Sequence, residues 1–311
     1  MSDHSPKKSD AANPTSLEHS FGGKWTSEKL TRLEKYLAAY AKVMKHQKFQ
    51  TLYIDAFAGS GWISLKDQSN PSQLALPEFG DEGAERFVQG SARIALQTDP
   101  PVNRNIFIEK DASRVAELQR LKEQFPDVAD RIDIRQDEAN TYLQRLCAQP
   151  IWKKHRAVLF LDPYGMQVEW RTLEMVAKTN AIDLWYLFPL GIGINRLLKK
   201  NGQIDEANAA RLTLVLGNED WRSVFFSPSQ QGDLFPHAEH TDKIAGFDAI
   251  EQFFIARLET VFPVVAKNPV RMLNSRGNPL YSLCFAAANK GRGGKIALRI
   301  ADHILRTKNG R

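Results

Sequence analysis

The loop D-A-F-A-G-S-G, from Asp55 to Gly61, restricts the fold of this chain more than any other segment. It closes a short run, residues 50–57, that is rich in apolar and aromatic side chains. Such a run is typical of a strand that is buried on both faces, as in a parallel sheet. Glycines directly after a strand let the backbone approach a ligand closely and tolerate positive φ. Because ligands of doubly wound sheets bind at the carboxyl ends of the strands, this loop is a candidate ligand site.

Strand-like and helix-like segments alternate up to residue 188. Apolar residues recur at three- and four-residue steps over residues 25–45, which predicts an amphipathic helix before the first strand. The alternation of strand-like and helix-like segments predicts a doubly wound α/β sheet whose strands are mostly parallel. The expected strands are residues 50–57, 105–109, 131–135, 156–161 and 182–188, and the expected helices between them are residues 91–97, 111–125, 138–148 and 170–178.

The pattern changes after residue 188. Residues 191–262 are mostly helical and predict a helical insertion, whereas residues 270–274 and 280–287 are strand-like and predict a hairpin. A parallel sheet closed by a C-terminal antiparallel hairpin is the strand plan of the Rossmann-like class I methyltransferase fold. We therefore expect one such domain over residues 21–311, with a polar inserted loop at residues 66–90. The polar residues 1–20 predict a disordered segment.

An acidic residue precedes the glycines of the first loop. The Asp55 carboxylate would repel a pyrophosphate, whereas S-adenosylmethionine presents an ammonium that Asp55 could hold directly or through water. Glu109 ends the second strand, where a carboxylate can accept both ribose hydroxyls, and Asp137 follows the third strand, near the expected adenine. An ordinary turn after a strand is the alternative. The residues expected to bind S-adenosylmethionine are Asp55, Phe57, Gly59, Gly61, Glu109 and Asp137.

The loop after the fourth strand carries the candidate catalytic residues Asp162, Pro163 and Tyr164, followed by Gly165. Asp162 and the Pro163 carbonyl could accept the two N–H groups of an exocyclic amine, while Tyr164 could stack on a flat base. These residue types also form plain turns, which is the alternative. The motif resembles the D-P-P-Y loop of DNA amino-methyltransferases. It is closer to the D-P-F-G or D-P-Y-G loop of tRNA guanine-N2 methyltransferases, which leaves the base open.

Several motifs over residues 24–200 resemble the three-Cys-motif partner (TcmP) family. They are Trp25 with Lys29, the run Y-I-D-A-F-A-G-S-G, Gly90-Ser91, Phe107-Ile-Glu109 and Leu161-Asp-Pro-Tyr-Gly165, with a weaker agreement at Asn274 and Pro279-Leu-Tyr281. The resemblance implies a bacterial, methyltransferase-like protein. It also implies a partner, a radical-type iron–sulfur protein that carries three cysteines. It implies no substrate.

Composition restricts the partners and the surroundings. Residues 290–311 contain seven Lys and Arg against one Asp, so this segment carries the whole net charge of +6. A basic end suits DNA or RNA, although a solvated or packed final helix is the alternative. The two cysteines are far apart in the sequence, and His237 and His240 have no third ligand near them, so we expect no metal site. We expect no membrane-spanning segment and a cytoplasmic location.

These observations favour an S-adenosylmethionine-dependent methyltransferase that methylates an amino group, expected on a nucleobase of DNA or RNA. The alternative is a non-catalytic, methyltransferase-like partner protein that keeps the fold as a scaffold in a bacterial complex.

Overall fold

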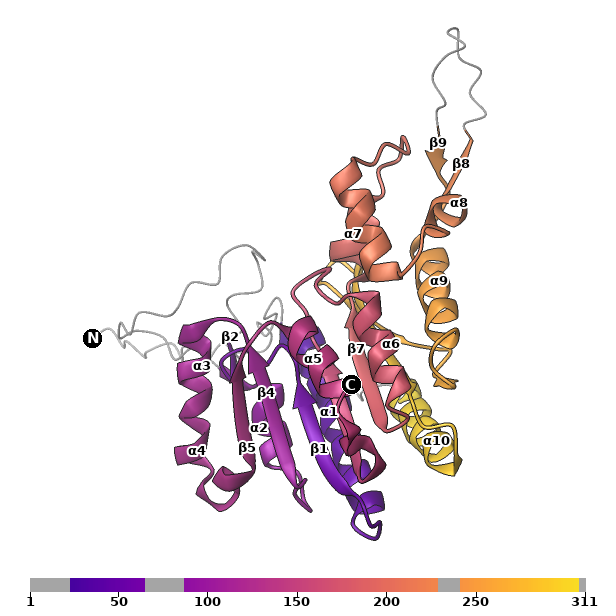
Figure 1. Ribbon diagram of the computed structural model, residues 1–311. Helices are drawn as coiled ribbons and strands as arrows, with labels where there is room; N and C mark the ends of the chain where they lie inside the picture. Colours follow the sequence, from indigo (N-terminus) through magenta and orange to yellow (C-terminus); the bar gives the residue numbers. More distant parts are fainter. Residues whose placement is uncertain (1–22, 65–86, 229–240, 308–311) are drawn as a thin grey trace, which may run out of the picture.

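The computed structural model describes residues 23–64, 87–228 and 241–307. The expected disordered segment 1–20, most of the loop 66–90 and both His237 and His240 lie outside the described residues. The main sheet has eight strands in the order β10-β12-β7-β6-β1-β4-β5, with β11 beside β12 (Figure 1). The strands are β1 (Gln50–Asp55), β4 (Arg104–Glu109), β5 (Ile132–Gln136), β6 (His155–Leu161), β7 (Ile182–Phe188), β10 (Val264–Val265), β11 (Val270–Leu273) and β12 (Pro279–Ala287).

Strand directions confirm the predicted fold class. The five strands from β5 to β7 are parallel, whereas β12 is antiparallel to β7 and also to β10 and β11 at the edge. The sheet is thus a parallel core closed by C-terminal antiparallel strands, as in Rossmann-like methyltransferases. Because β1 pairs with β4 on one side and β6 on the other, the first strand is central.

Helices cover both faces of the sheet, which explains why its central strands are mostly apolar. Ile54, Leu159 and Tyr186 face a core formed with α5, α6 and α9, whereas the adjacent Tyr53 and Phe160 face a second core with α1, α2 and α10. Successive strand residues point to opposite faces, so both sets must be apolar. The helices are α1 (Gly23–Met44), α2 (Ser91–Leu96), α3 (Ala112–Gln119), α4 (Leu121–Gln124), α5 (Ala139–Cys147), α6 (Trp170–Lys178), α9 (Phe247–Glu259) and α10 (Arg292–Arg306).

The segment between β7 and β10 is mostly helical, as predicted. It also contains a short antiparallel ladder that the sequence did not predict. In Figure 1, α7, α8 and this ladder extend beyond the carboxyl edge of the sheet, while α9 packs against it. The elements are η4 (Leu190–Asn195), α7 (Glu206–Leu216), α8 (Trp221–Phe225), β8 (Phe226–Pro228) and β9 (Thr241–Lys243).

One predicted helix is broken in two. Residues 111–125 form α3 and α4 because the Arg120 N–H donates to the Glu117 carbonyl, three residues back, at 3.1 Å. This tighter bond ends the regular α-helical pattern, and a 3₁₀ turn follows from Pro126.

Within the basic C-terminal segment, α10 (Arg292–Arg306) forms the packed final helix that was one of the alternatives. Buried apolar residues of α10, among them Ala301 and Leu305, join the core under α1, while Lys295, Arg299 and Arg306 are exposed. No described helix is long and apolar enough to cross a membrane.

Candidate functional site

Three carboxylates meet at the carboxyl edge of the sheet. Asp55 ends β1, Glu109 ends β4 and Asp162 follows β6, and these three strands are neighbours. Because parallel strands end at the same edge, residues more than a hundred positions apart converge there. The structure therefore brings together the two loops that the sequence identified separately.

Asp55 is completely buried. Its Oδ2 accepts hydrogen bonds from the Ser91 hydroxyl at 2.5 Å and the Tyr53 hydroxyl at 3.3 Å, and its Oδ1 accepts one from the Phe57 N–H at 3.2 Å. Burial raises the pKa of Asp55 to about 7 although these hydrogen bonds oppose the shift, and the charge of Asp162 raises it further. Since no solvent reaches Asp55, its visible role is to fix the glycine loop; contact with a cofactor stays a prediction.

The glycine loop has the backbone shape that was predicted for it. Gly59 and Gly61 have φ of +61° and +80°, a region that side chains disfavour. Around Gly59 no atom of the described residues, apart from Gly59 and its two chain neighbours, lies within 4 Å of the place a Cβ would occupy, so the described part of the chain leaves this face of the loop open. The Gly90 N–H donates to the Gly61 carbonyl at 3.0 Å. A Cβ on Gly90 would lie 2.9 Å from the Gly61 carbonyl group, so only glycine fits there.

Glu109, at the end of β4, holds the same loop by hydrogen bonds. Its Oε2 accepts the Gly59 N–H at 3.0 Å, and its Oε1 accepts the N–H groups of Lys110 and Asp111 at 2.8 and 2.9 Å. A carboxylate accepts about four hydrogen bonds. In this geometry Glu109 thus has room for about one more hydrogen bond, whereas the sequence prediction gave it two ribose hydroxyls.

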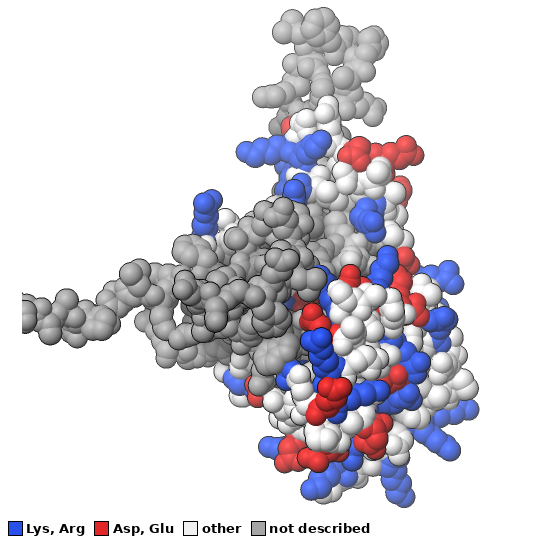
Figure 2. Space-filling view, turned by 90° about the vertical axis from the view of Figure 1, so that its left-hand side faces the viewer, with Lys and Arg blue, Asp and Glu red and all other residues white. Residues whose placement is uncertain are grey.

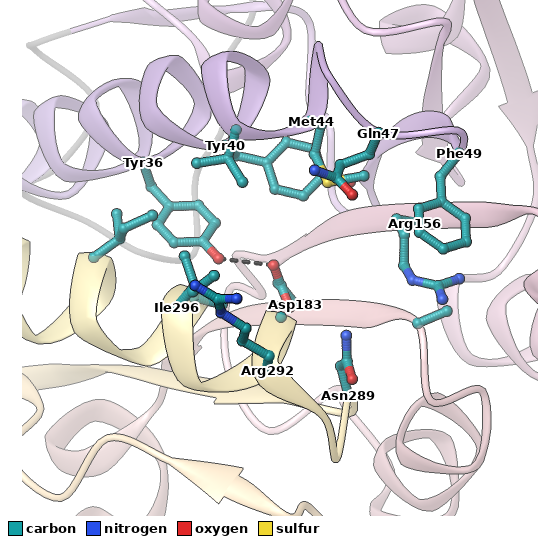
Figure 3. A pocket seen from close by; sticks show the side chains of 15 residues that line it. Tyr36, Tyr40, Met44, Gln47, Phe49, Arg156, Asp183, Asn289, Arg292 and Ile296 are labelled. Atoms are coloured by element: carbon teal, nitrogen blue, oxygen red, sulfur yellow. Dashed lines mark hydrogen bonds between the residues drawn. The ribbon is translucent and has the colours of Figure 1, made fainter.

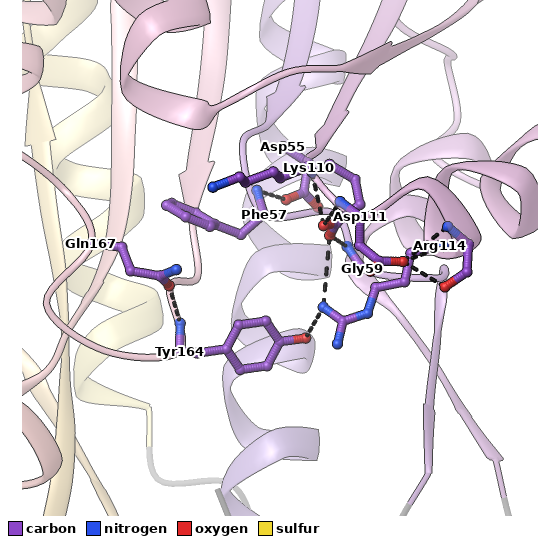
Figure 4. A network of polar contacts seen from close by, with 10 residues as sticks. Asp55, Phe57, Gly59, Lys110, Asp111, Arg114, Tyr164 and Gln167 are labelled. Atoms are coloured by element: carbon purple, nitrogen blue, oxygen red, sulfur yellow. Dashed lines mark hydrogen bonds and ion pairs between the residues drawn. The ribbon is translucent and has the colours of Figure 1, made fainter. Parts of the chain in front are cut away.

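Arg114, from α3, contacts both Glu109 and Tyr164, and Figure 4 shows its guanidinium beside the Tyr164 hydroxyl. One guanidinium nitrogen donates to the Tyr164 hydroxyl at 3.3 Å and lies 4.0 Å from Glu109 Oε2. The guanidinium also lies 5.3 Å from the centre of the Tyr164 ring. The ring is 51% exposed, so a surface for stacking remains. No role was predicted for Arg114, because only the fold brings these two loops together.

A second cation, Lys29, is paired with Asp162. Lys29 comes from α1, is 5% exposed, and its ammonium forms an ion pair with Asp162 Oδ2. The same ammonium lies 4.9 Å from the centre of the Trp25 ring, which stacks on Tyr281 of β12 with ring centres 5.4 Å apart. No chemical role was predicted for Trp25 and Lys29, although their spacing of four places them on one face of a helix.

The remaining predicted residues lie at the same edge. Asp137 follows β5, its N–H donates to the Glu109 carbonyl at 3.2 Å, and its carboxylate pairs with Arg145. Phe57 is partly buried in the glycine loop, and Pro163 is buried after β6. No group of His, Cys, Asp and Glu suited to a metal ion occurs among the residues that the structure describes.

Comparison with known proteins gives only distant likenesses. No family model and no curated protein matches the chain, so the TcmP resemblance stays a prediction. The Legionella pneumophila protein LPL1258, assigned to DUF519, is 13% identical with a TM-score of 0.45; the match covers 91% of this chain and 92% of that one. A spermidine synthase bound to a transition-state analogue is 12% identical with a TM-score of 0.39, and the match covers 88% of this chain and 62% of that one. The Synechocystis magnesium protoporphyrin IX methyltransferase with bound SAM is 10% identical with a TM-score of 0.30, and the match covers 70% of this chain and 77% of that one. These likenesses transfer neither an activity nor a substrate.

Proposed function

We propose that this protein is an S-adenosylmethionine-dependent methyltransferase. The observation that carries the proposal is the glycine loop itself, which has no described residue packed against Gly59 and whose Phe57 and Gly59 N–H groups donate to buried carboxylates. Asp55 holds the loop from β1, and Glu109 holds it from β4. A cationic cofactor suits an edge with three acidic residues, whereas a pyrophosphate would be repelled there.

The residues present fit the cofactor. Glu109 keeps one acceptor position for a ribose hydroxyl, and the open face at Gly59 lets the ligand approach the backbone. Bound S-adenosylmethionine would supply a methyl group on a sulfonium, which an amine can attack directly. The acceptor amine would lose a proton as it is methylated, and Asp162 is the carboxylate to which we assign the uptake of that proton.

We propose an amino group of a nucleobase in DNA or RNA as the acceptor. Tyr164 is exposed, and Lys29, the partner of Asp162, lies over the ring of Trp25. A flat base could stack on the exposed ring of Tyr164. The exposed basic residues of α10 would add non-specific attraction to phosphates. On the face shown in Figure 2, the described Lys and Arg side chains are interspersed with Asp and Glu, so that face offers no purely basic surface.

Calorimetric titration of S-adenosylmethionine tests the cofactor site. Glu109→Gln should weaken binding about tenfold, since the charge-assisted hydrogen bond to a ribose hydroxyl becomes a neutral one. Glu123→Gln, the same change on the exposed surface of α4, should leave binding unchanged. If wild-type protein that is well folded binds no S-adenosylmethionine, the proposal is wrong.

Transfer of a labelled methyl group to tRNA and to duplex DNA tests the acceptor. Asp162→Asn keeps the shape of the loop but removes the carboxylate. It should abolish transfer while leaving the dissociation constant of S-adenosylmethionine within about twofold. Transfer that continues unchanged in this variant would remove Asp162 from the chemistry.

The scaffold function is the second candidate, and the Lys29–Asp162 ion pair favours it. One oxygen of this carboxylate, Oδ2, is already paired with a buried ammonium, which leaves mainly the other oxygen for a substrate amine. Under this proposal the chain binds a three-cysteine iron–sulfur partner, as the TcmP resemblance implies, and transfers no methyl group. Co-purification of such a partner, together with absent binding of S-adenosylmethionine, would favour the scaffold.

A further inference from the structure

A cavity of about 500 Å³ lies between α1 and α10, at the amino ends of β6 and β7. It is thus at the edge of the sheet opposite the glycine loop. Its walls are mostly apolar, and its floor is polar, with Asp183 below Tyr36 and Tyr40 (Figure 3). The apolar wall includes Val43, Met44, Phe49, Ile296, Ala297 and Ile300.

The polar floor is rich in hydrogen-bond donors. Arg156 uses one nitrogen for the carbonyls of Trp152 and His155, which leaves its other N–H groups free for a ligand. Arg292 extends from α10 towards the floor and has no partner among the described residues. Asn289 accepts the Gly291 N–H with its side-chain oxygen, so its amide NH₂ is the free group.

Asp183 is the single carboxylate on this floor. One of its oxygens accepts the Tyr36 hydroxyl at 2.8 Å, and the other is free to accept a hydrogen bond. Burial raises the pKa of Asp183 to about 7, against the opposing effects of the Tyr36 hydrogen bond and the Arg156 charge. Because two arginines flank one acid, the floor suits a ligand head that is anionic and carries one donor.

Tyr40 points to a missing partner. It is 6% exposed, and its hydroxyl is buried without any hydrogen-bond partner. Burial raises the pKa of Tyr40, and the charges of Asp183 and Arg156 also act on it, so the hydroxyl lies near both groups. Buried hydroxyls are nearly always paired. A ligand oxygen between Asp183 and Arg156 would satisfy this one.

We propose that the cavity between α1 and α10 binds a small amphipathic carboxylic acid with a hydroxyl or amino donor next to its carboxylate. The carboxylate lies between Arg156 and Arg292 and accepts the Tyr40 hydroxyl. The adjacent donor binds the free oxygen of Asp183, and the apolar part lies along Met44 and Ile296. The proposal is independent of the methyltransferase function, since no residue of the cavity belongs to the glycine loop or the Asp162 loop.

Calorimetric titration with three compounds of one shape tests the ligand class. 3-Phenyllactate carries a hydroxyl beside the carboxylate, L-phenylalanine carries an ammonium there, and 3-phenylpropionate carries neither. At least one of the first two should bind about tenfold more tightly than 3-phenylpropionate, because only they supply the donor for Asp183. The tighter of the two identifies the source as a hydroxy acid or an amino acid. If neither binds at millimolar concentration, the proposal is wrong.

Two variant pairs locate the binding. Arg292→Gln should weaken it about tenfold, whereas Arg299→Gln, the same change at another exposed position of α10 that does not line the cavity, should not. Tyr40→Phe should weaken binding several-fold yet leave the melting temperature of the empty protein unchanged or higher, since it removes an unpaired hydroxyl. Tyr36→Phe, one helical turn away, should instead lower the melting temperature, because it breaks the bond to Asp183. Binding that is unaffected in both Arg292→Gln and Tyr40→Phe would overturn the proposal.

Discussion

Replacement of Asp55 by asparagine should make the protein more stable at neutral pH, although it removes a residue at the centre of the proposed site. The carboxylate is fully buried and has three hydrogen-bond donors around it, but no cation among the described residues. Asparagine keeps the shape and can still accept the Phe57 N–H. Its amide group can donate to the hydroxyls of Ser91 and Tyr53, which accept as well as donate.

The size of the effect follows from the pKa. Asp55 titrates at about 7 in the folded protein, against the ordinary 3.8. Between these values the folded state keeps a proton that the unfolded state has released, so stability falls as the pH rises through this window. A shift of about three units corresponds to about 4 kcal/mol at pH 8, as an upper limit. Below pH 4 the shift contributes nothing to the difference between the two proteins.

Urea unfolding of wild type and Asp55→Asn at pH 5, 6, 7 and 8 measures this difference. The free energy of unfolding of the variant, relative to wild type, should rise steadily over the series and level off above pH 7. Asp183, whose pKa is also raised to about 7, is present in both proteins, so its effect cancels. A difference that stays constant from pH 5 to pH 8 would refute the reasoning, because it would mean that Asp55 titrates alike in both states.

Three other substitutions test separate parts of the site. Gly90→Ala should weaken S-adenosylmethionine binding and lower the melting temperature, because its Cβ would press on the Gly61 carbonyl; calorimetry and thermal unfolding measure both. Lys29→Met should destabilise the protein by about 3–5 kcal/mol in urea unfolding, since it leaves the partly buried Asp162 without its cation. Asp111→Ala should destabilise the protein at neutral pH but progressively less as the pH falls through the lowered pKa of Asp111, the cap of α3, which acid unfolding would show.

The sheet could be predicted from the sequence because its strands have a strong local signature. A strand covered on both faces, such as Ile182–Phe188, is apolar at all positions but Asp183 near its amino end, and its bounds were predicted without error. The glycine loop was equally clear, since positive φ at Gly59 and Gly61 has a distinct residue preference. Both features are determined by residues that are close together in the sequence, so they can be predicted from it directly.

Contacts between distant elements left no such signature. Lys29 reaches Asp162 across 133 residues, and Arg114 reaches Tyr164 across 50. Neither pair could be matched without knowing that α1 and α3 both lie against the carboxyl edge. The unpaired hydroxyl of Tyr40 was likewise hidden, because its helical spacing is that of an ordinary core residue. In each case the contacts of the side chain depend on the order of the strands in the sheet, which its residue type does not show.

The raised pKa of Asp55 connects stability with the proposed function. Of the three carboxylates at this edge, Asp162 has Lys29 and Glu109 has Arg114, whereas Asp55 has no cationic partner among the described residues. A bound cationic cofactor would supply that charge and lower the pKa of Asp55.

Binding should then release a proton below pH 7, and the affinity for S-adenosylmethionine should rise with pH up to about 7 and level off above it. Calorimetry at pH 6 in two buffers of different ionisation enthalpy measures the released proton. If the two heats of binding agree for wild type, as they should for Asp55→Asn, Asp55 does not sense the cofactor and serves only to fix the loop.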